Sequence, residues 1–361
     1  MPLPSRLALL AALVATTPVA SAQAPAAAPA AAPLAAPLVF EGGEGPGHGK
    51  HVVLLAGDEE YRSEEALPML GKLLAVRHGF KCTVLFSLDR ESGEINPDEQ
   101  THVPGLAALD SADAAVLFWR FRELPDADMK HFVDFLDAGK PLLAIRTSTH
   151  AFAYSRHKAS PYARFSFDSG EWEGGFGRQV LGDTWISHHG HHGSQSTRGV
   201  VEPSNASHPI LRGVADVWGP TDVYGIVHLL PTDTVLLRGA VLDGMSPDSK
   251  PVAGAPNEPM MPLLWTRERP HGATTQRFVT STIGAATDLA SEDLRRAFVN
   301  SIYWGLRMEA QIPERSDARL VGDYAPSPFG FGTWKRGVKP SDHALPAKPG
   351  AASGAAPASK Q

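Results

Sequence analysis

The sequence has 361 residues, of which 43% are hydrophobic and 20% are charged, as in ordinary globular proteins. This length allows one large domain or two small ones. The net charge of −6, without a basic stripe, argues against nucleic acid as a partner. Cys82 is the only cysteine, which excludes an intramolecular disulfide and any cysteine-based zinc site.

The first 22 residues have the pattern of a secretory signal peptide. Arg6 precedes a short apolar core, and the segment ends in Ala20-Ser21-Ala22, an A-x-A cleavage site. We expect cleavage after Ala22 and a periplasmic or secreted protein, because the apolar core is too short for a stable membrane span. An uncleaved N-terminal anchor is the alternative.

Composition divides the rest of the chain into three parts. Alanine and proline dominate the stretch that follows the signal peptide, and proline, alanine, glycine, serine and lysine return near the C-terminus. We therefore expect a signal peptide at 1–22, a linker at 23–47, one domain at 48–334 and a disordered tail at 335–361.

The elements that follow alternate between buried strands and helices. Apolar runs predict strands at 51–57, 81–88, 113–119 and 141–146, with helices at 63–78 and 125–138. This spacing predicts an α/β fold, a doubly wound, mostly parallel, flavodoxin-like sheet. Glycines, aromatics and histidines dominate 150–200, which favours a long loop or β insertion over the cleft. The last elements expected are a β meander at 234–238, 261–265 and 276–284, then a helix at 291–306.

Polar side chains follow three of the predicted strands. In an open α/β sheet, ligands bind beyond the carboxyl ends of the strands, so these side chains should meet in one cleft. Acid–base chemistry would use Asp58, Glu59, His150 and His188, and Arg146 would stabilise a developing oxyanion. A structural network of ion pairs is the alternative. The residues expected to bind substrate are Glu60, Tyr61, Arg62, Arg120, Arg122, Ser148, Asp222 and Tyr224.

The segment from His188 to His192 contains the densest group of histidines. Imidazole is a common metal ligand, but a zinc site needs further ligands from elsewhere in the chain. We therefore expect no metal and no other cofactor, with a divalent metal as the alternative and His189 and His191 as its weak candidates. No G-x-S-x-G elbow is present, so Ser148 is not expected to act as a nucleophile.

In the order of its landmarks the sequence resembles the ThuA-like (trehalose utilisation) family, whose fold is that of class I glutamine amidotransferases. The resemblance covers roughly residues 50–306. The landmarks are Gly57-Asp58-Glu59, Pro141 to Arg146, Gly174 to Gly177, Leu181-Gly182, the His188 region, His208-Pro209-Ile210, Thr221 to Tyr224, Pro262 to Trp265, Phe278 to Gly284, and Tyr303 to Leu306.

Three departures from the family pattern bear on function. Arg146 stands where the family has Gly-Ile-His, at the corner where amidotransferases place their cysteine. The family's Asp-Glu-x-Tyr is here the stretch from Thr221 to Tyr224, and its Gly-His is Gly284-Ala285. Glutamine hydrolysis is therefore not expected.

The resemblance implies a small carbohydrate as the ligand. We expect an exported enzyme that acts on a sugar or sugar derivative by acid–base chemistry in a polar cleft. The alternative is a non-catalytic protein that binds a carbohydrate or an anion. The sequence leaves the oligomeric state open, with a homo-oligomer as one alternative.

Overall fold

The computed structural model describes residues 36–346, which lie in one compact unit. The expected signal peptide and residues 23–35 of the expected linker fall outside them. Ten strands form one mixed sheet in the order β1-β3-β2-β4-β5-β12-β11-β10-β7-β8, and β6 pairs with β9. The strands are β1 (Leu38–Phe40), β2 (His51–Gly57), β3 (Lys81–Phe86), β4 (Ala114–Trp119), β5 (Leu142–Ile145), β6 (His188–His189), β7 (Thr197–Val201), β8 (Val217–Gly219), β9 (Val223–Tyr224), β10 (Thr234–Val241), β11 (Met261–His271) and β12 (Thr274–Ser281).

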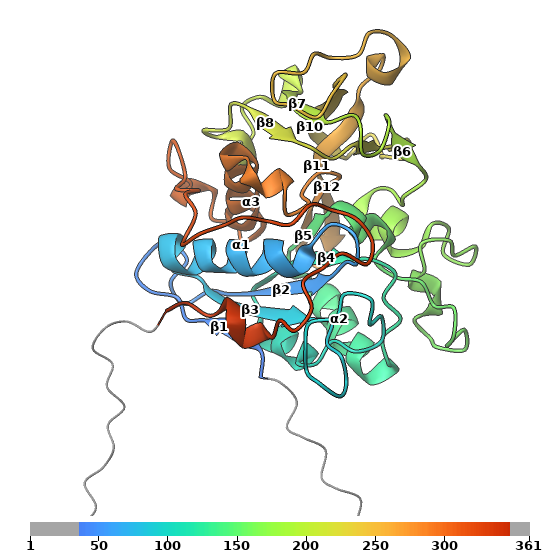
Figure 1. Cartoon of the computed structure of the whole chain (residues 1–361), viewed down its shortest axis with the longest axis vertical. Coiled ribbons are helices and arrows are strands. Elements are labelled where there is room, and N and C mark those ends of the chain that lie inside the picture. Colours follow the sequence, from blue (N-terminus) through green and yellow to red (C-terminus); the bar gives the residue numbers. More distant parts are fainter. Residues whose placement is uncertain (1–35, 347–361) are drawn as a thin grey trace, which may run out of the picture. The chain divides into compact units, whose positions relative to one another are not determined.

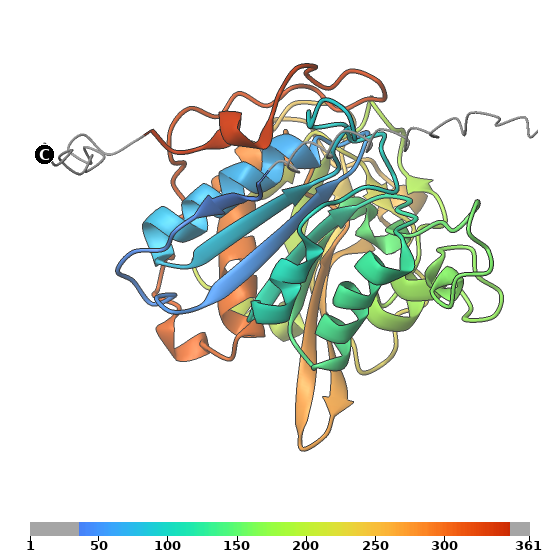
Figure 2. The same ribbon diagram turned by 90° about the horizontal axis from the view of Figure 1, so that it is seen from below.

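The half of the sheet from β3 to β12 is parallel, as the runs of apolar residues predict. Helices α1 (Ser63–His78) and α3 (Glu292–Gly305) cover one face, and α2 (Asp126–Asp137) covers the other (Figure 2). Each face has its own apolar core, one built around α1 and α3 and one around α2. Because helices cover both faces of these strands, a ligand can approach the strands at their carboxyl ends, which we call the open edge.

The other half of the sheet is antiparallel. Strands β12, β11 and β10 follow one another as the expected meander, and β7 and β8 extend it. Five of the nine strand pairs in the sheet are antiparallel, so the expectation of a mostly parallel sheet was wrong in its proportion. The reason is that short strands such as β7 and β8 carry too little pattern to be found in the sequence. The α/β class itself is confirmed.

The ordered body extends beyond 48–334 at both ends. Within the expected linker, β1 pairs with β3, and the side chain of Phe40 is buried. Within the expected tail, the backbone N–H of Ile95 donates to the carbonyl oxygen of Val338 (2.8 Å), and His343 stacks on Phe86. The predicted domain bounds, 48 and 334, therefore enclose too little of the chain. Composition alone does not reveal the added parts, because a few apolar residues suffice to attach a polar segment to the core.

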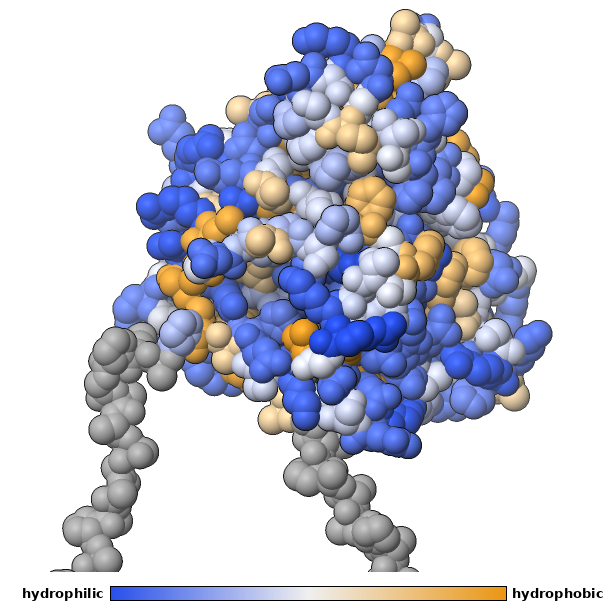
Figure 3. All heavy atoms as spheres, viewed as in Figure 1, coloured by the Kyte–Doolittle hydropathy of each residue, from blue (hydrophilic) through white to orange (hydrophobic). Residues whose placement is uncertain are grey.

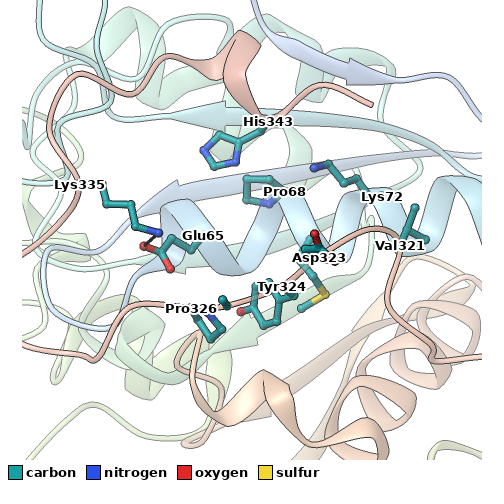
Figure 4. Close-up of a pocket in the computed structure, with 11 residues that line it drawn as sticks. Glu65, Pro68, Lys72, Val321, Asp323, Tyr324, Pro326, Lys335 and His343 are labelled. Carbon is teal, nitrogen blue, oxygen red and sulfur yellow. Dashed lines mark ion pairs between the residues drawn. The ribbon is translucent and has the colours of Figure 1, made fainter. Parts of the chain in front are cut away.

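The C-terminal segment 320–346 runs across α1 (Figure 1). A cavity of about 160 Å³ separates the two, with Lys335 paired to Glu65 (3.6 Å) at one side (Figure 4). None of the residues expected in the functional site lines this cavity. On the same face, apolar residues lie in several separate groups among polar ones (Figure 3). In the described part of the chain, no helix has the length and apolarity needed to cross a membrane.

Candidate functional site

Backbone strain marks the open edge of the parallel strands. Four non-glycine residues among 36–346 have a φ in the left-handed region, and three of them follow neighbouring strands. These are Arg62 (φ 61°) after β2, Phe121 (φ 54°) after β4 and Arg146 (φ 45°) after β5. Such conformations cost about 1–3 kcal/mol each and tend to gather at functional sites. The three turns therefore point to this edge independently of any side-chain argument.

Arg146 is fully buried and binds Asp222. Its guanidinium donates to the Asp222 carboxylate (2.9 Å) and carbonyl oxygen (2.9 Å), and to the carbonyl oxygen of Thr282 (2.7 Å). It lies over the rings of Tyr61 (3.9 Å from the guanidinium carbon to the centroid) and Tyr224 (4.7 Å). Enclosed in this way, Arg146 acts on Asp222 and does not line the cavity described below.

Asp222 also holds two histidines. Its carboxylate lies 2.5 Å from Nδ1 of His188 and 3.0 Å from Nδ1 of His192. Burial opposes ionisation of Asp222, but the hydrogen bonds from the two histidines and the charge of Arg146 hold its pKa well below its usual range. Asp222 is therefore a buried carboxylate with three cationic or hydrogen-bonding partners.

His192 connects Asp222 to the turn after β2. Its Nε2 lies 3.3 Å from a carboxylate oxygen of Glu60. Hydrogen bonds to Asp222 and then to Glu60 raise the pKa of His192 to about 9, so the ring carries a positive charge at neutral pH. The rings of His192 and His188 are 4.5 Å apart between centroids.

His150 has the opposite environment. Its ring is buried among Phe121, Trp185 and Tyr224, with centroids 5.2, 5.5 and 5.9 Å away. Burial, followed by the charge of Arg120, lowers the pKa of His150 well below its usual range. His150 is therefore neutral at pH 7 while His192 is charged, a separation typical of sites that divide acid and base roles.

A small cavity opens between these groups. Its volume of about 30 Å³ is enough for one or two water molecules. His188 contributes its ring to the lining. Nδ1 of this ring is bound to Asp222, and Nε2 has no hydrogen-bond partner within the described residues. The residues that line the cavity are Glu60, Tyr61, Arg120, Phe121, His150, Trp185, His188 and Tyr224.

Five of the expected site residues lie behind this cavity as scaffold. The carboxylate of Asp58 accepts the backbone N–H groups of Glu60 and Tyr61, and burial raises its pKa. Ser148 donates to the carbonyl oxygens of Leu117 and Ile145. The remaining three bind protein groups around the turns and do not line the cavity: Glu59, Arg62 and Arg122.

Sequence reasoning missed three residues at the site. His192 was seen only as a member of the histidine run, and Phe121 and Trp185 were not singled out. The sequence signal that could have found His192 is its spacing of four residues from His188. The turn that includes Gly190 brings both rings to the Asp222 carboxylate. The weak metal candidates lie elsewhere, since His189 binds the carbonyl oxygen of Pro256 (2.7 Å) and His191 is exposed.

Two imidazoles and one carboxylate could also hold a divalent ion. One ligand atom from each of His188, His192 and Asp222 lies within 4.8 Å of the others. Such a set, with one position open, is typical of catalytic zinc sites. The Arg146 guanidinium on the same carboxylate already supplies positive charge, which disfavours an added cation.

No family model matches the chain, and no curated protein matches it. It is similar to the solved structure of a protein described as ThuA-like from Bacteroides uniformis, with 12% identity, a TM-score of 0.45 and coverage of 73% of this chain and 92% of that chain. A second such protein, from Parabacteroides merdae, has 11% identity, a TM-score of 0.44 and coverage of 71% and 90%.

Proposed function

We propose that this protein is a ThuA-like enzyme that acts on a sugar or sugar derivative by acid–base chemistry at the open edge of the parallel strands. The observation that carries the proposal is the pairing of His188 with Asp222. The carboxylate accepts the Nδ1 proton, which leaves Nε2 of His188 as a proton acceptor beside the cavity.

The neighbouring groups suit proton transfer from a hydroxylated ligand. Nε2 of His188 would take a proton from a hydroxyl or an activated C–H group placed in the cavity. Arg120 lines the same cavity and would donate a hydrogen bond to a ligand oxygen placed there. His192 and Arg146 hold Asp222 ionised, so that Asp222 keeps the His188 ring oriented.

Export is part of the proposal and rests on the sequence alone. The positive n-region, apolar core and A-x-A site of residues 1–22 support it. N-terminal sequencing of protein recovered from the periplasm or the medium should begin at Gln23. A chain recovered there that still begins at Met1 would contradict cleavage.

The deciding experiment compares His188→Ala with His191→Ala. The second variant is a matched control because His191 is exposed and lies away from the cavity. Binding of a sugar panel that includes trehalose is measured by thermal shift, and turnover of each ligand that binds is followed by mass spectrometry. We expect His188→Ala to lose about 10²–10⁴-fold in turnover with little change in affinity.

Other outcomes would favour the competing functions. Sugar binding without turnover in the unmodified protein would support a non-catalytic binding protein. Stoichiometric metal in the purified protein, lost in His188→Ala but not in His191→Ala, would support metal-assisted chemistry at the same residues.

A further inference from the structure

The cavity is too small for the ligand that we propose. Its volume of about 30 Å³ accommodates one polar group. Pockets that enclose a whole small-molecule ligand are about 300–1,000 Å³. Most of a sugar must therefore lie outside the cavity, on the surface around its mouth.

Aromatic rings occupy that surface on the side of Arg120. The guanidinium carbon of Arg120 lies 4.5 Å from the ring centroid of Phe121 and 4.8 Å from that of Phe331. Phe331 is 57% exposed, the highest exposure among the aromatic residues at the site. An aromatic ring exposed beside a polar cavity can pack on the apolar face of a ligand that reaches into that cavity.

Phe331 is held in place although it comes from the far end of the chain. The preceding residue, Gly330, donates its N–H to the carbonyl oxygen of Glu60 (2.8 Å) and accepts from the guanidinium of Arg62 (2.5 Å). Arg62 also donates to Thr333. Phe329, which precedes Gly330, contacts the rings of Tyr61 and His192. The C-terminal segment is thus fastened to the turn that carries Glu60.

The charges around Arg120 indicate a neutral ligand. Its guanidinium lies 2.5 Å from a carboxylate oxygen of Glu59 and 4.0 Å from one of Glu60. The charge of Arg120 is therefore already paired with Glu59, and an anion would have to compete with that carboxylate. A pyranose ring presents C–H groups on one face and hydroxyls at its edge, so it can pack on an aromatic ring while its hydroxyls reach charged side chains.

We propose that Phe331 and Phe121, with Arg120 beside both rings, form a subsite that binds the ring of a neutral pyranoside outside the cavity. The inference rests on the proposed function and adds a substrate class and a specificity residue to it. One substituent of the ring enters the cavity, and the C-terminal segment forms part of the binding surface.

The test measures the affinity of Phe331 variants for three probes by calorimetry: trehalose, methyl β-D-glucopyranoside and glucose 6-phosphate. Phe331→Ala and Phe331→Leu should bind both neutral probes at least about tenfold more weakly, and Phe331→Trp should bind them within about threefold of the unmodified protein. Val76→Ala is the control, because Val76 is also an exposed apolar residue (48%) but lies on α1 and does not line the cavity.

Each outcome bears on one of the two proposals or on both. Neutral probes that bind equally well to the unmodified protein and to Phe331→Ala would overturn the subsite and leave the proposed function standing. Preference for glucose 6-phosphate would overturn the neutral class. A folded, unmodified protein that binds neither neutral probe would overturn both the subsite and its premise.

Discussion

Glu64 should make the stability of this protein fall as the pH rises. The residue lies in the first turn of α1 and is 7% exposed, and neither carboxylate oxygen has a hydrogen-bond partner within residues 36–346. Its surroundings include the apolar side chains of Ala56, Phe86 and Ile95. Burial raises the pKa of Glu64 from about 4.5 to about 8.

The size of the effect follows from this difference in pKa. Between about pH 4.5 and pH 8 the folded protein keeps the Glu64 proton, whereas the unfolded chain has lost it. Stability therefore decreases with rising pH, by about 1.4 kcal/mol per pH unit. The decrease is complete above pH 8 and sums to about 5 kcal/mol, a large share of the stability of a typical domain.

Glu64→Gln removes this titration and keeps the shape of the side chain. Urea unfolding of both proteins at pH 5.5 and pH 7.5 gives the difference in their free energies of unfolding at each pH. Other titrating groups contribute to both proteins and cancel in the comparison. We expect the stability of the variant relative to the unmodified protein to rise by about 3 kcal/mol between the two pH values.

An exposed carboxylate provides the matched control. Glu91→Gln changes the same chemical group in an exposed loop, and its difference from the unmodified protein should be the same at both pH values. Parallel pH dependence of Glu64→Gln and the unmodified protein would refute the argument, because it would mean that the Glu64 carboxyl is ionised in the folded state.

Three further predictions concern the site, the sheet edge and the cysteine. Asp222→Asn should destabilise the protein by about 3–5 kcal/mol in urea unfolding, because it leaves the buried Arg146 without its charge partner; a loss below 1 kcal/mol would contradict the ion pair. Phe40→Ala should cost about 3–5 kcal/mol, although Phe40 lies in a segment that reads as a linker; unchanged stability would show that β1 is not docked. The thiol of Cys82 should resist a thiol reagent in the native protein and react once in denaturant, since it is fully buried; rapid native labelling would contradict this.

The regular elements near the open edge could be predicted because their signals are local. The helix at Ser63–His78 has acidic residues in its first turn and Gly79 as its stop, and its bounds match the expectation. The strand His51–Gly57 is an uninterrupted apolar run between polar segments. Such patterns depend only on neighbouring residues, so the sequence displays them directly.

The construction of the site could not be predicted because its contacts join distant segments. Asp222 binds Arg146 from 76 residues away and His188 from 34 residues away. Arg62 and Thr333 are separated by 271 residues. Periodicity and capping say nothing about which strand end meets which loop. The sequence therefore placed its candidate residues at the carboxyl ends of the strands, but it did not show which of them would face the cavity and which would support it.

Arg146 illustrates how the position of a residue can suggest a role that its contacts exclude. It follows β5, at the position that the sequence resemblance equates with a nucleophile corner, and its φ lies in the left-handed region. Its side chain, however, turns inward to Asp222 and is fully buried. Removing it would leave the buried Asp222 carboxylate with only the two histidine rings as side-chain partners among the described residues, and the carboxylate that orients His188 would be less stable. In the proposed function Arg146 is therefore a positioning residue, and the imidazoles that Asp222 holds are the groups that would act on the ligand.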